Sequence, residues 1–187
     1  SYRVQKKDCL DLPKKIFMSR TVELTKEQEE AYATMKSAAL ASLKGKMATA
    51  PHVLTQLMRL HQITCGHLKS DDGVITNFKH SRIEELIDVI DEMEGKVIIW
   101  ANYVHDIKEI TKALEKEYDE GCVAQYYGEV STDDRQKAIK DFQNPKSKVR
   151  YFVGNTQTGG YGITLTAASN VIYYSNSYDL EKRLQSE

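Results

Sequence analysis

Apolar runs and amphipathic segments alternate regularly after Ser81. Four runs have the Val, Ile and Tyr content typical of strands: KVIIW at 96–100, CVAQYY at 122–127, VRYFV at 149–153 and VIYY at 171–174. A segment with apolar residues three or four apart precedes each of the first three runs, which indicates helices. Strands joined through helices make right-handed crossovers, so the sequence predicts an α/β protein whose mostly parallel sheet has helices on both faces.

The first part of the chain has a different pattern. Residues 13–24 read as an extended segment, one helix is expected to end at Gly45, and another opens after Pro51. We therefore expect a link and a helical appendage at 1–80, followed by the α/β domain at 81–187. Three helix starts have the spacing of a capping box: Thr25 with Gln28, Ser81 with Glu84, and Ser131 with Asp134.

Composition limits the class of protein. The chain has 187 residues, of which 41% are apolar, and it contains no apolar run as long as a membrane span and no signal-peptide core. Its three cysteines are scattered, which fits reduced thiols and a cytoplasmic location. Residues 1–80 carry 13 Lys and Arg against 8 Asp and Glu, an excess too diffuse to indicate nucleic-acid binding by itself.

Neither a metal site nor a catalytic set is expected. The spacing of His52, His61, Cys65 and His67 matches no zinc pattern. No nucleophile lies at an informative distance from a base and an orienting group in the sequence. We therefore predict no catalytic residue and no metal ligand in this chain.

The loop from Gly154 to Thr164 contains no charged residue and is rich in Gly and Thr, so its backbone can approach a phosphate closely. It lacks the Gly-Lys-Ser/Thr ending of a Walker A loop, and it does not follow a first strand as a dinucleotide-binding loop does. On these grounds a phosphate site and a tight structural turn are equally favoured. Asn102 and Tyr103 could bind phosphate or cap the next helix, and Gly128 could be a turn residue.

Five segments, in this order, resemble the Swi/Snf family of DNA-dependent ATPases in helicase superfamily two. DLPKKIFMSRTVELTKEQEEAY resembles the link out of the first lobe, and LTQLMRLHQITCGHL a helix that follows it. KVIIWANY resembles motif IV, YYGEVSTDDRQKAIKDFQ the next conserved segment, and NTQTGGYGITLTAASNVIYYSNSYD motif V. The match is to the second, C-terminal RecA-like lobe and covers nearly the whole chain.

This resemblance implies a lobe of a motor that hydrolyses ATP and moves along double-stranded DNA. Mg and ATP would be bound mainly by a first RecA-like lobe, which would also be the partner of this one. Nucleotide contacts would come from Gly160 and Gly162. Contacts with the DNA backbone would come from Asn102, Tyr103, Gly128, Thr156, Gln157, Thr158 and Gly159. The location would then be the nucleoid in a prokaryotic or viral setting, or the nucleus in a eukaryote.

The sequence also departs from the family pattern. Motif IV usually has Ser-Gln where this chain has Ala101 and Asn102, Ser-Thr is replaced by Glu129 and Val130, and the Arg-Ala of motif V is Gln157 and Thr158. Glu129 would repel a DNA phosphate. The arginines of motif VI would come after Glu187, so we expect the chain alone to be inactive. The alternative is a non-enzymatic RecA-like interaction module that has lost motor activity.

Overall fold

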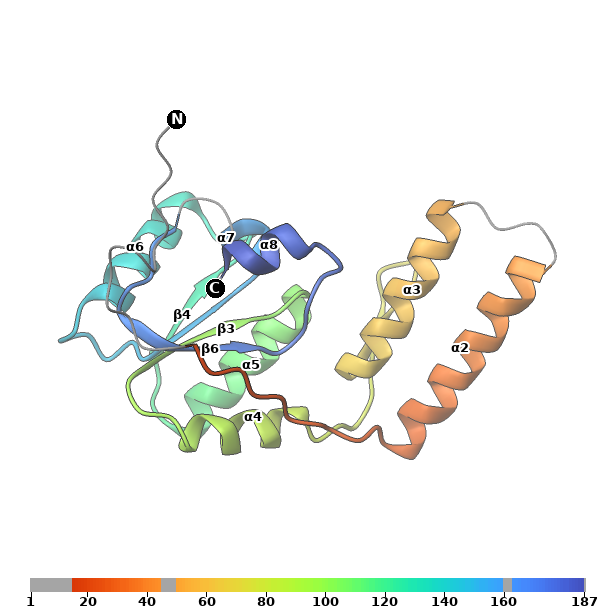
Figure 1. Cartoon of the computed structure of the whole chain (residues 1–187), viewed down its shortest axis with the longest axis horizontal. Helices are drawn as coiled ribbons and strands as arrows, with labels where there is room; N and C mark the ends of the chain where they lie inside the picture. The colour runs from red at the N-terminus through yellow and green to blue at the C-terminus, as the bar shows by residue number, and fades with distance from the viewer. Residues whose placement is uncertain (1–14, 45–49, 160–162, 187) are drawn as a thin grey trace.

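The computed structural model describes residues 15–44, 50–159 and 163–186, and a four-stranded sheet forms its centre (Figure 1). The strands are hydrogen-bonded in the order β4-β5-β3-β6, and every neighbouring pair is parallel. Their bounds are Lys96–Trp100 for β3, Val123–Tyr126 for β4, Tyr151–Gly154 for β5 and Ala168–Tyr173 for β6. The predicted α/β class with a parallel sheet is therefore confirmed.

Strand β3 is central because its side chains can be buried on both faces. Val97 to Trp100 are all buried, which explains why this strand reads as an unbroken apolar run. Val97 pairs with Tyr151 of β5 and with Asn170 of β6. Edge strand β6 alternates between exposed and half-buried positions, and it begins three residues before the predicted VIYY run because Ala168, Ser169 and Asn170 extend it.

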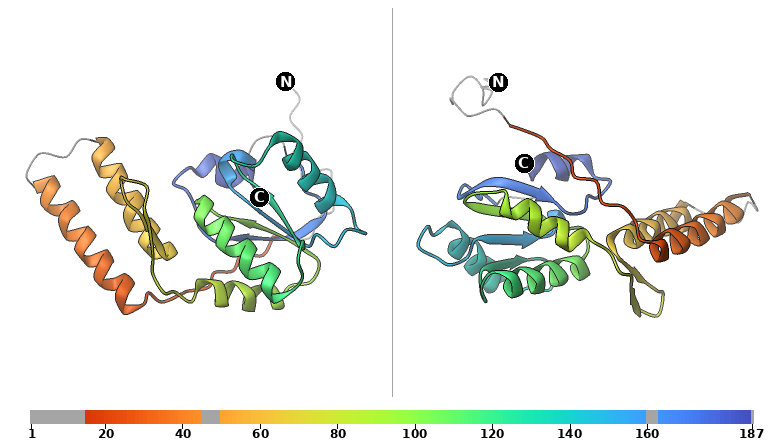
Figure 2. Two further views of the ribbon diagram at one scale, coloured as in Figure 1. Left: turned by 180° about the vertical axis from the view of Figure 1, so that it is seen from behind. Right: turned by 90° about the horizontal axis from the view of Figure 1, so that it is seen from below.

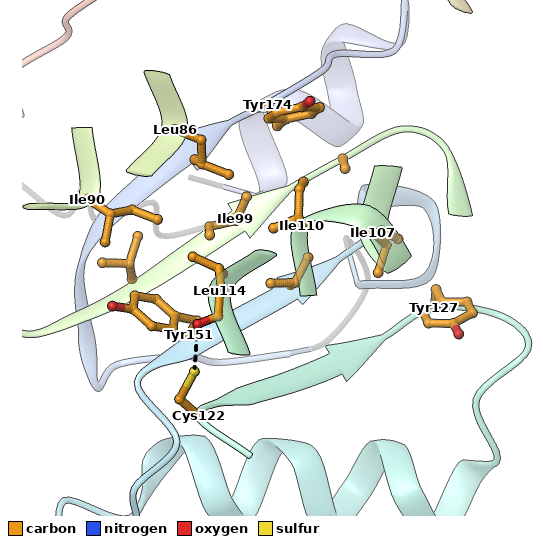
Figure 3. Close-up of a cluster of buried hydrophobic side chains, with 13 residues drawn as sticks. Leu86, Ile90, Ile99, Ile107, Ile110, Leu114, Cys122, Tyr127, Tyr151 and Tyr174 are labelled. Carbon is orange, nitrogen blue, oxygen red and sulfur yellow. Dashed lines mark hydrogen bonds between the residues drawn. The ribbon is translucent and has the colours of Figure 1, made fainter. Parts of the chain in front are cut away.

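Two helices cover one face of the sheet. Helix α4 spans Arg82–Asp91 and helix α5 spans Val104–Glu117. Figure 3 shows their apolar side chains, which include Leu86, Ile90, Ile107, Ile110 and Leu114, meeting Ile99 and Tyr151 from the strands. The Cys122 thiol donates to the Leu114 carbonyl oxygen at 3.8 Å within this cluster. The five helix residues repeat at intervals of three or four, so the sheet buries one complete stripe of each helix.

A second cluster covers the opposite face. Helix α6, Thr132–Gln143, buries Phe142 against Phe152, and their ring centroids lie 5.3 Å apart. The short helix α8, Leu180–Gln185, ends on the same face, where the Trp100 indole donates to the Ser186 carbonyl oxygen at 3.3 Å. The predicted covering of both faces by helices is confirmed.

The three capping boxes have different outcomes. The Ser131 hydroxyl accepts the Asp134 N–H at 3.1 Å, and the Gln28 side-chain oxygen accepts the Thr25 N–H at 3.1 Å, as predicted. The box at Ser81 is wrong, because its side chain makes no cap hydrogen bond. The N–H of Arg82 instead donates to Nδ1 of His80 at 3.3 Å. Another local contact, with the ring of His80 two residues before Arg82, is thus present where the Ser81 cap was expected.

Helices α2 and α3 lie beside the sheet rather than on either of its faces, as Figures 1 and 2 show from three directions. Their bounds are Lys26–Lys44 and Ala50–Cys65, and they pack against each other. The expected stop at Gly45 lies outside the described residues. Residues 15–25 form no helix or strand, and the side chains at 16–18 are exposed.

Four elements were not predicted. An antiparallel hairpin joins β1 (His67–Lys69) to β2 (Ile75–Asn77), and helix α7 (Thr156–Gly159) occupies part of the Gly-rich loop. Helix α8 is the fourth. Among the helices within the described residues, none is both long enough and apolar enough to span a bilayer.

Candidate functional site

The carboxyl ends of β3 and β5 form the point where the chain changes direction across the sheet. After β3 the chain crosses to β4 on the far side of β5, whereas after β5 it crosses to β6 on the opposite side of β3. Loops that leave adjacent parallel strands in opposite directions are the usual place for a ligand in such a sheet. Two of the predicted site segments, the one after Trp100 and the one after Gly154, begin here.

The two loops are joined directly. The Asn155 side-chain amide donates to the Asn102 carbonyl oxygen at 2.6 Å. The Ala101 N–H donates to the Gly154 carbonyl oxygen at 2.9 Å, which continues the ladder one residue beyond the strands. The segments that resemble motifs IV and V are therefore held in one arrangement.

Asn155 also organises the first turn after β5. Its Oδ1 accepts the Gln157 N–H at 2.7 Å, and its carbonyl oxygen accepts the Thr158 N–H at 3.1 Å. The Gln157 side chain is exposed, Thr158 is half-buried and Thr156 is buried. Of the predicted contacts in this turn, Gln157 thus presents its side chain to solvent, Thr158 does so only in part, and Thr156 does not. Gly160 and Gly162 lie outside the described residues.

Asn102 is anchored from a third strand. Its N–H donates to the Ser175 hydroxyl at 2.8 Å, and Ser175 follows β6. That hydroxyl donates in turn to Oδ2 of Asp106, a fully buried carboxylate in the first turn of α5, at 3.3 Å. The Asn102 backbone is therefore bonded on both sides, by Ser175 and by Asn155, while its side chain is half-buried.

Tyr103 faces the helical appendage. Its hydroxyl lies 3.0 Å from Nδ1 of His61 and 3.3 Å from the Met58 carbonyl oxygen, both in α3. Its ring meets that of His67 edge-on, with centroids 5.1 Å apart. Burial, followed by the charge of Cys65, raises the pKa of this phenol, so Tyr103 is neutral at physiological pH.

The loop after β4 stands apart from these residues. Gly128 is exposed, and a side chain there would meet open space. Its neighbour Glu129 pairs with Lys108 of α5 at 3.2 Å, and the hydrogen bond with Glu129 raises the pKa of Lys108. Within the described residues, no hydrogen bond joins Gly128 to Asn102 or Asn155.

Three residues that organise the site were assigned no individual role from the sequence. Asn155 follows β5 directly, and Ser175 lies two residues after β6, as Asn102 lies two residues after β3, so position alone could have indicated them. Asp106 precedes Ile110 by four residues, which places it on the buried side of α5. A carboxylate on that side is a signal that a buried polar partner exists.

The His and Cys residues of the appendage do not gather. Within the described ranges, no group of three or more His, Cys, Asp or Glu side chains is arranged to hold a metal ion. His52 instead contacts the side chain of Gln56 at 3.3 Å, and Cys65 is buried with its pKa raised to about 12 by desolvation. Cys65 is thus part of the packing of α3, whereas His52 lies on its exposed surface.

Comparison with known proteins identifies the lobe. The model of the helicase conserved C-terminal domain matches residues 79–187. The chain belongs to this family. The solved SWI2/SNF2 ATPase core domain of Sulfolobus solfataricus is 28% identical, covers 96% of this chain and 38% of its own, and superposes with a TM-score of 0.74. The RecA-like fold and the Swi/Snf type of this helicase lobe are thereby confirmed.

Two further relatives extend the comparison. The Sulfolobus solfataricus SWI2/SNF2 ATPase core in complex with double-stranded DNA is 25% identical and covers 89% of this chain and 37% of its own, with a TM-score of 0.68. An uncharacterized ATP-dependent helicase of Mycoplasma genitalium is 27% identical over 92% of this chain. This helicase lobe spans only 17% of the length of that relative.

Proposed function

We propose that this lobe is part of an ATP-dependent translocase on double-stranded DNA, in which it contacts the DNA backbone and a first RecA-like lobe. The observation that carries the proposal is the bond between Asn155 and Asn102, because it fixes the motif IV and motif V loops side by side at the carboxyl edge of the sheet. The likeness to an ATPase core solved with double-stranded DNA supports DNA as the partner. Residues 1–80 would link this lobe to the first RecA-like lobe and would form the helical appendage of this lobe.

The proposed DNA contacts are to phosphates and sugars. Asn102, Tyr103, Gly128 and the turn at 156–159 supply amides, hydroxyls and backbone N–H groups but no charge. Groups of this kind bind backbone oxygens and fix register without reading sequence. Each contributes affinity without releasing counterions, so the salt dependence of binding would come from lysines and arginines elsewhere.

ATP and Mg would be bound mainly by the first lobe. The described residues of this chain offer no group of three or more His, Cys, Asp or Glu side chains that could hold a metal ion. Gly160 and Gly162 are proposed to approach the nucleotide from this side. We assign no catalytic step to this lobe and propose that it is inactive alone, because ATP and Mg would be held mainly by the first lobe.

The test uses the complete gene product. Its ATP hydrolysis is measured with and without duplex DNA, and the 187-residue chain alone serves as the control. We expect duplex DNA to stimulate hydrolysis by the complete protein and to leave the chain alone without activity. Hydrolysis that does not respond to DNA would refute the proposal.

A second candidate is a non-enzymatic interaction module. Glu129 favours it, because a carboxylate at the carboxyl edge opposes DNA, although its pairing with Lys108 offsets part of that charge. Gln157 favours it too, since an arginine usual in the family is replaced by a neutral side chain. A complete protein that binds neither ATP nor duplex DNA would support the module.

A further inference from the structure

An unbroken series of polar contacts runs from the appendage to the turn after β5. Nδ1 of His67 lies 3.1 Å from Oδ1 of Asp106, and Oδ2 of Asp106 accepts from the Ser175 hydroxyl at 3.3 Å. The Ser175 oxygen accepts the Asn102 N–H at 2.8 Å. The series continues from the Asn102 carbonyl oxygen through the Asn155 side chain to the Gln157 N–H, over 2.6 and 2.7 Å.

Only one assignment of donors and acceptors satisfies the hydrogen bonds of this series. The single proton of the Ser175 hydroxyl goes to Asp106, which leaves the hydroxyl oxygen free to accept the N–H of Asn102. The Asn155 amide places its NH₂ at a carbonyl oxygen and its Oδ1 at an N–H, so its orientation is fixed as well. The contact with His67 is different, because Nδ1 of this ring and Oδ1 of Asp106 lie close together without a well-formed hydrogen bond between them.

Burial indicates that the series is maintained against a cost. Asp106 is fully buried, and His67 and Ser175 are 2% and 7% exposed. A buried carboxylate loses its hydration, and that loss is recovered only through well-placed partners. An apolar side chain at position 106 would pack on the same face of α5 without this cost. The carboxylate therefore serves a polar arrangement rather than the packing of the core.

We propose that Asp106, Ser175 and Asn155 are positioning residues, which couple the motif IV loop, the motif V turn and the end of β6 into one unit. Its relevance to DNA rests on the proposed function, because Asn102 and Gln157 are DNA contacts only if that proposal holds. The coupling itself does not rest on the proposed function, since it is a property of this chain. It requires that the loss of one hydrogen bond in the series weakens the next one.

Amide hydrogen exchange of the 187-residue chain tests the coupling. In Ser175→Ala we expect exchange at the Asn102 N–H to increase roughly 3- to 10-fold, the effect of one lost hydrogen bond. The Gln157 N–H, two links further on, is expected to exchange at least about twice as fast. Ser175→Thr keeps the hydroxyl and should restore both rates.

Two further variants keep the test decisive. Asn170→Ala removes a similar amide bond, to the Glu94 carbonyl oxygen at 2.9 Å, at the opposite end of β6 and should leave both amides unchanged. If Ser175→Ala does not fold, Asn155→Ala tests the series from its other, half-exposed end. This variant should increase exchange at the Gln157 and Asn102 amides together. An unchanged Gln157 amide in Ser175→Ala, or an unchanged Asn102 amide in Asn155→Ala, overturns the coupling.

The functional consequence is measured separately in the complete gene product. Ser175→Ala should raise the duplex concentration that gives half-maximal stimulation of ATP hydrolysis several-fold, and Ser175→Thr should return it. If the unmutated protein is not stimulated by DNA, the proposed function fails while the exchange data still decide the coupling. If stimulation is normal in Ser175→Ala although both amides are released, the assignment as positioning residues is wrong.

Discussion

Replacing Gly66 by alanine should destabilise the chain through two separate effects. Gly66 follows α3 with φ of +96°, a left-handed conformation, and its N–H donates to the Ile63 carbonyl oxygen at 3.1 Å. A Cβ atom at this position would lie only 1.9 Å from Cδ2 of His80. A residue with a side chain is less stable in this backbone conformation than glycine is, and the His80 imidazole must also move away from the added Cβ.

The two costs can be estimated and separated. Left-handed backbone costs a non-glycine residue about 1–2 kcal/mol, and forcing extra volume into a packed site costs about 1–3 kcal/mol. The His80 side chain is 6% exposed and lies 3.3 Å from Glu109, so its ring cannot move without disturbing that pair. Gly73 is the matched control, because its φ is +86° but nothing lies within 4 Å of the added Cβ. Gly66→Ala should thus cost about 2–5 kcal/mol and Gly73→Ala about 1–2 kcal/mol.

Urea and thermal unfolding of the two variants and the unmutated chain measure this difference. For a chain of this size, each kcal/mol corresponds to about 2–4 °C in Tm. Gly66→Ala should therefore lower Tm by roughly 5–20 °C, and clearly more than Gly73→Ala. Equal losses in the two variants would show that His80 moves freely, and the reasoning from its close contact would be refuted.

Two further predictions concern charge. Burial, with smaller contributions from Arg82 at His61 and from His67 at His105, lowers the pKa of both imidazoles below 6.5. The unfolded chain therefore binds more protons than the folded chain in this range, and stability should be fully present above pH 6.5 and fall as pH drops towards 5. Urea midpoints at pH 7.5 and 5.5 measure the fall, and a midpoint that rises on acidification contradicts it; replacing both residues by glutamine should flatten the dependence. Gln157→Arg adds a cation where the family usually has one, so duplex binding should strengthen and the slope of log affinity against log salt should steepen by about 0.9, as measured by fluorescence anisotropy. The same substitution at exposed Gln136, in the middle of α6, is the control, and an unchanged slope in Gln157→Arg would place residue 157 away from phosphate.

The predictable parts of the fold are those with a strong local signal. The run at 96–100 has the predicted bounds because burial on both faces requires the side chains from Val97 to Trp100 to be apolar. The hairpin of β1 and β2 was missed because its strands have three residues each and those of β2 are all exposed. The sequence therefore shows no alternation of apolar and polar residues there. The cap predicted at Ser81 failed although its spacing was right, since Ser81 makes no cap hydrogen bond and a competing local acceptor, the His80 ring, takes the Arg82 N–H.

The site was predictable only in part. Asn102 and the turn at 156–159 could be placed at strand ends from the alternation of elements alone. Their connection could not, because the strand order that makes β3 and β5 neighbours is a long-range property that no local pattern encodes. Position at strand ends could indicate Asn155 and Ser175, but their bonds to Asn102 became visible only when that order brought the loops together.

The appendage and the sheet are joined at several independent places. His67 contacts Asp106, His80 pairs with Glu109, and Arg82 donates both to the Thr64 carbonyl oxygen in α3 and to the Tyr174 carbonyl oxygen after β6. A hinge between these parts would have to break all of these contacts at once, including one at a fully buried carboxylate. We therefore expect the two parts to move as one body.

Residues 15–25 offer a contrast. This segment has no regular structure, the side chains of Ile16, Phe17 and Met18 are 85%, 70% and 79% exposed, and an ion pair of Arg20 with Glu92 holds it to the lobe at the surface. Exposed ion pairs add little stability, and segments with few buried contacts open most easily. Motion of this lobe relative to a neighbouring lobe is therefore expected to be accommodated in this segment, which leaves the loops bonded through Asn155 unchanged in shape as the lobe moves.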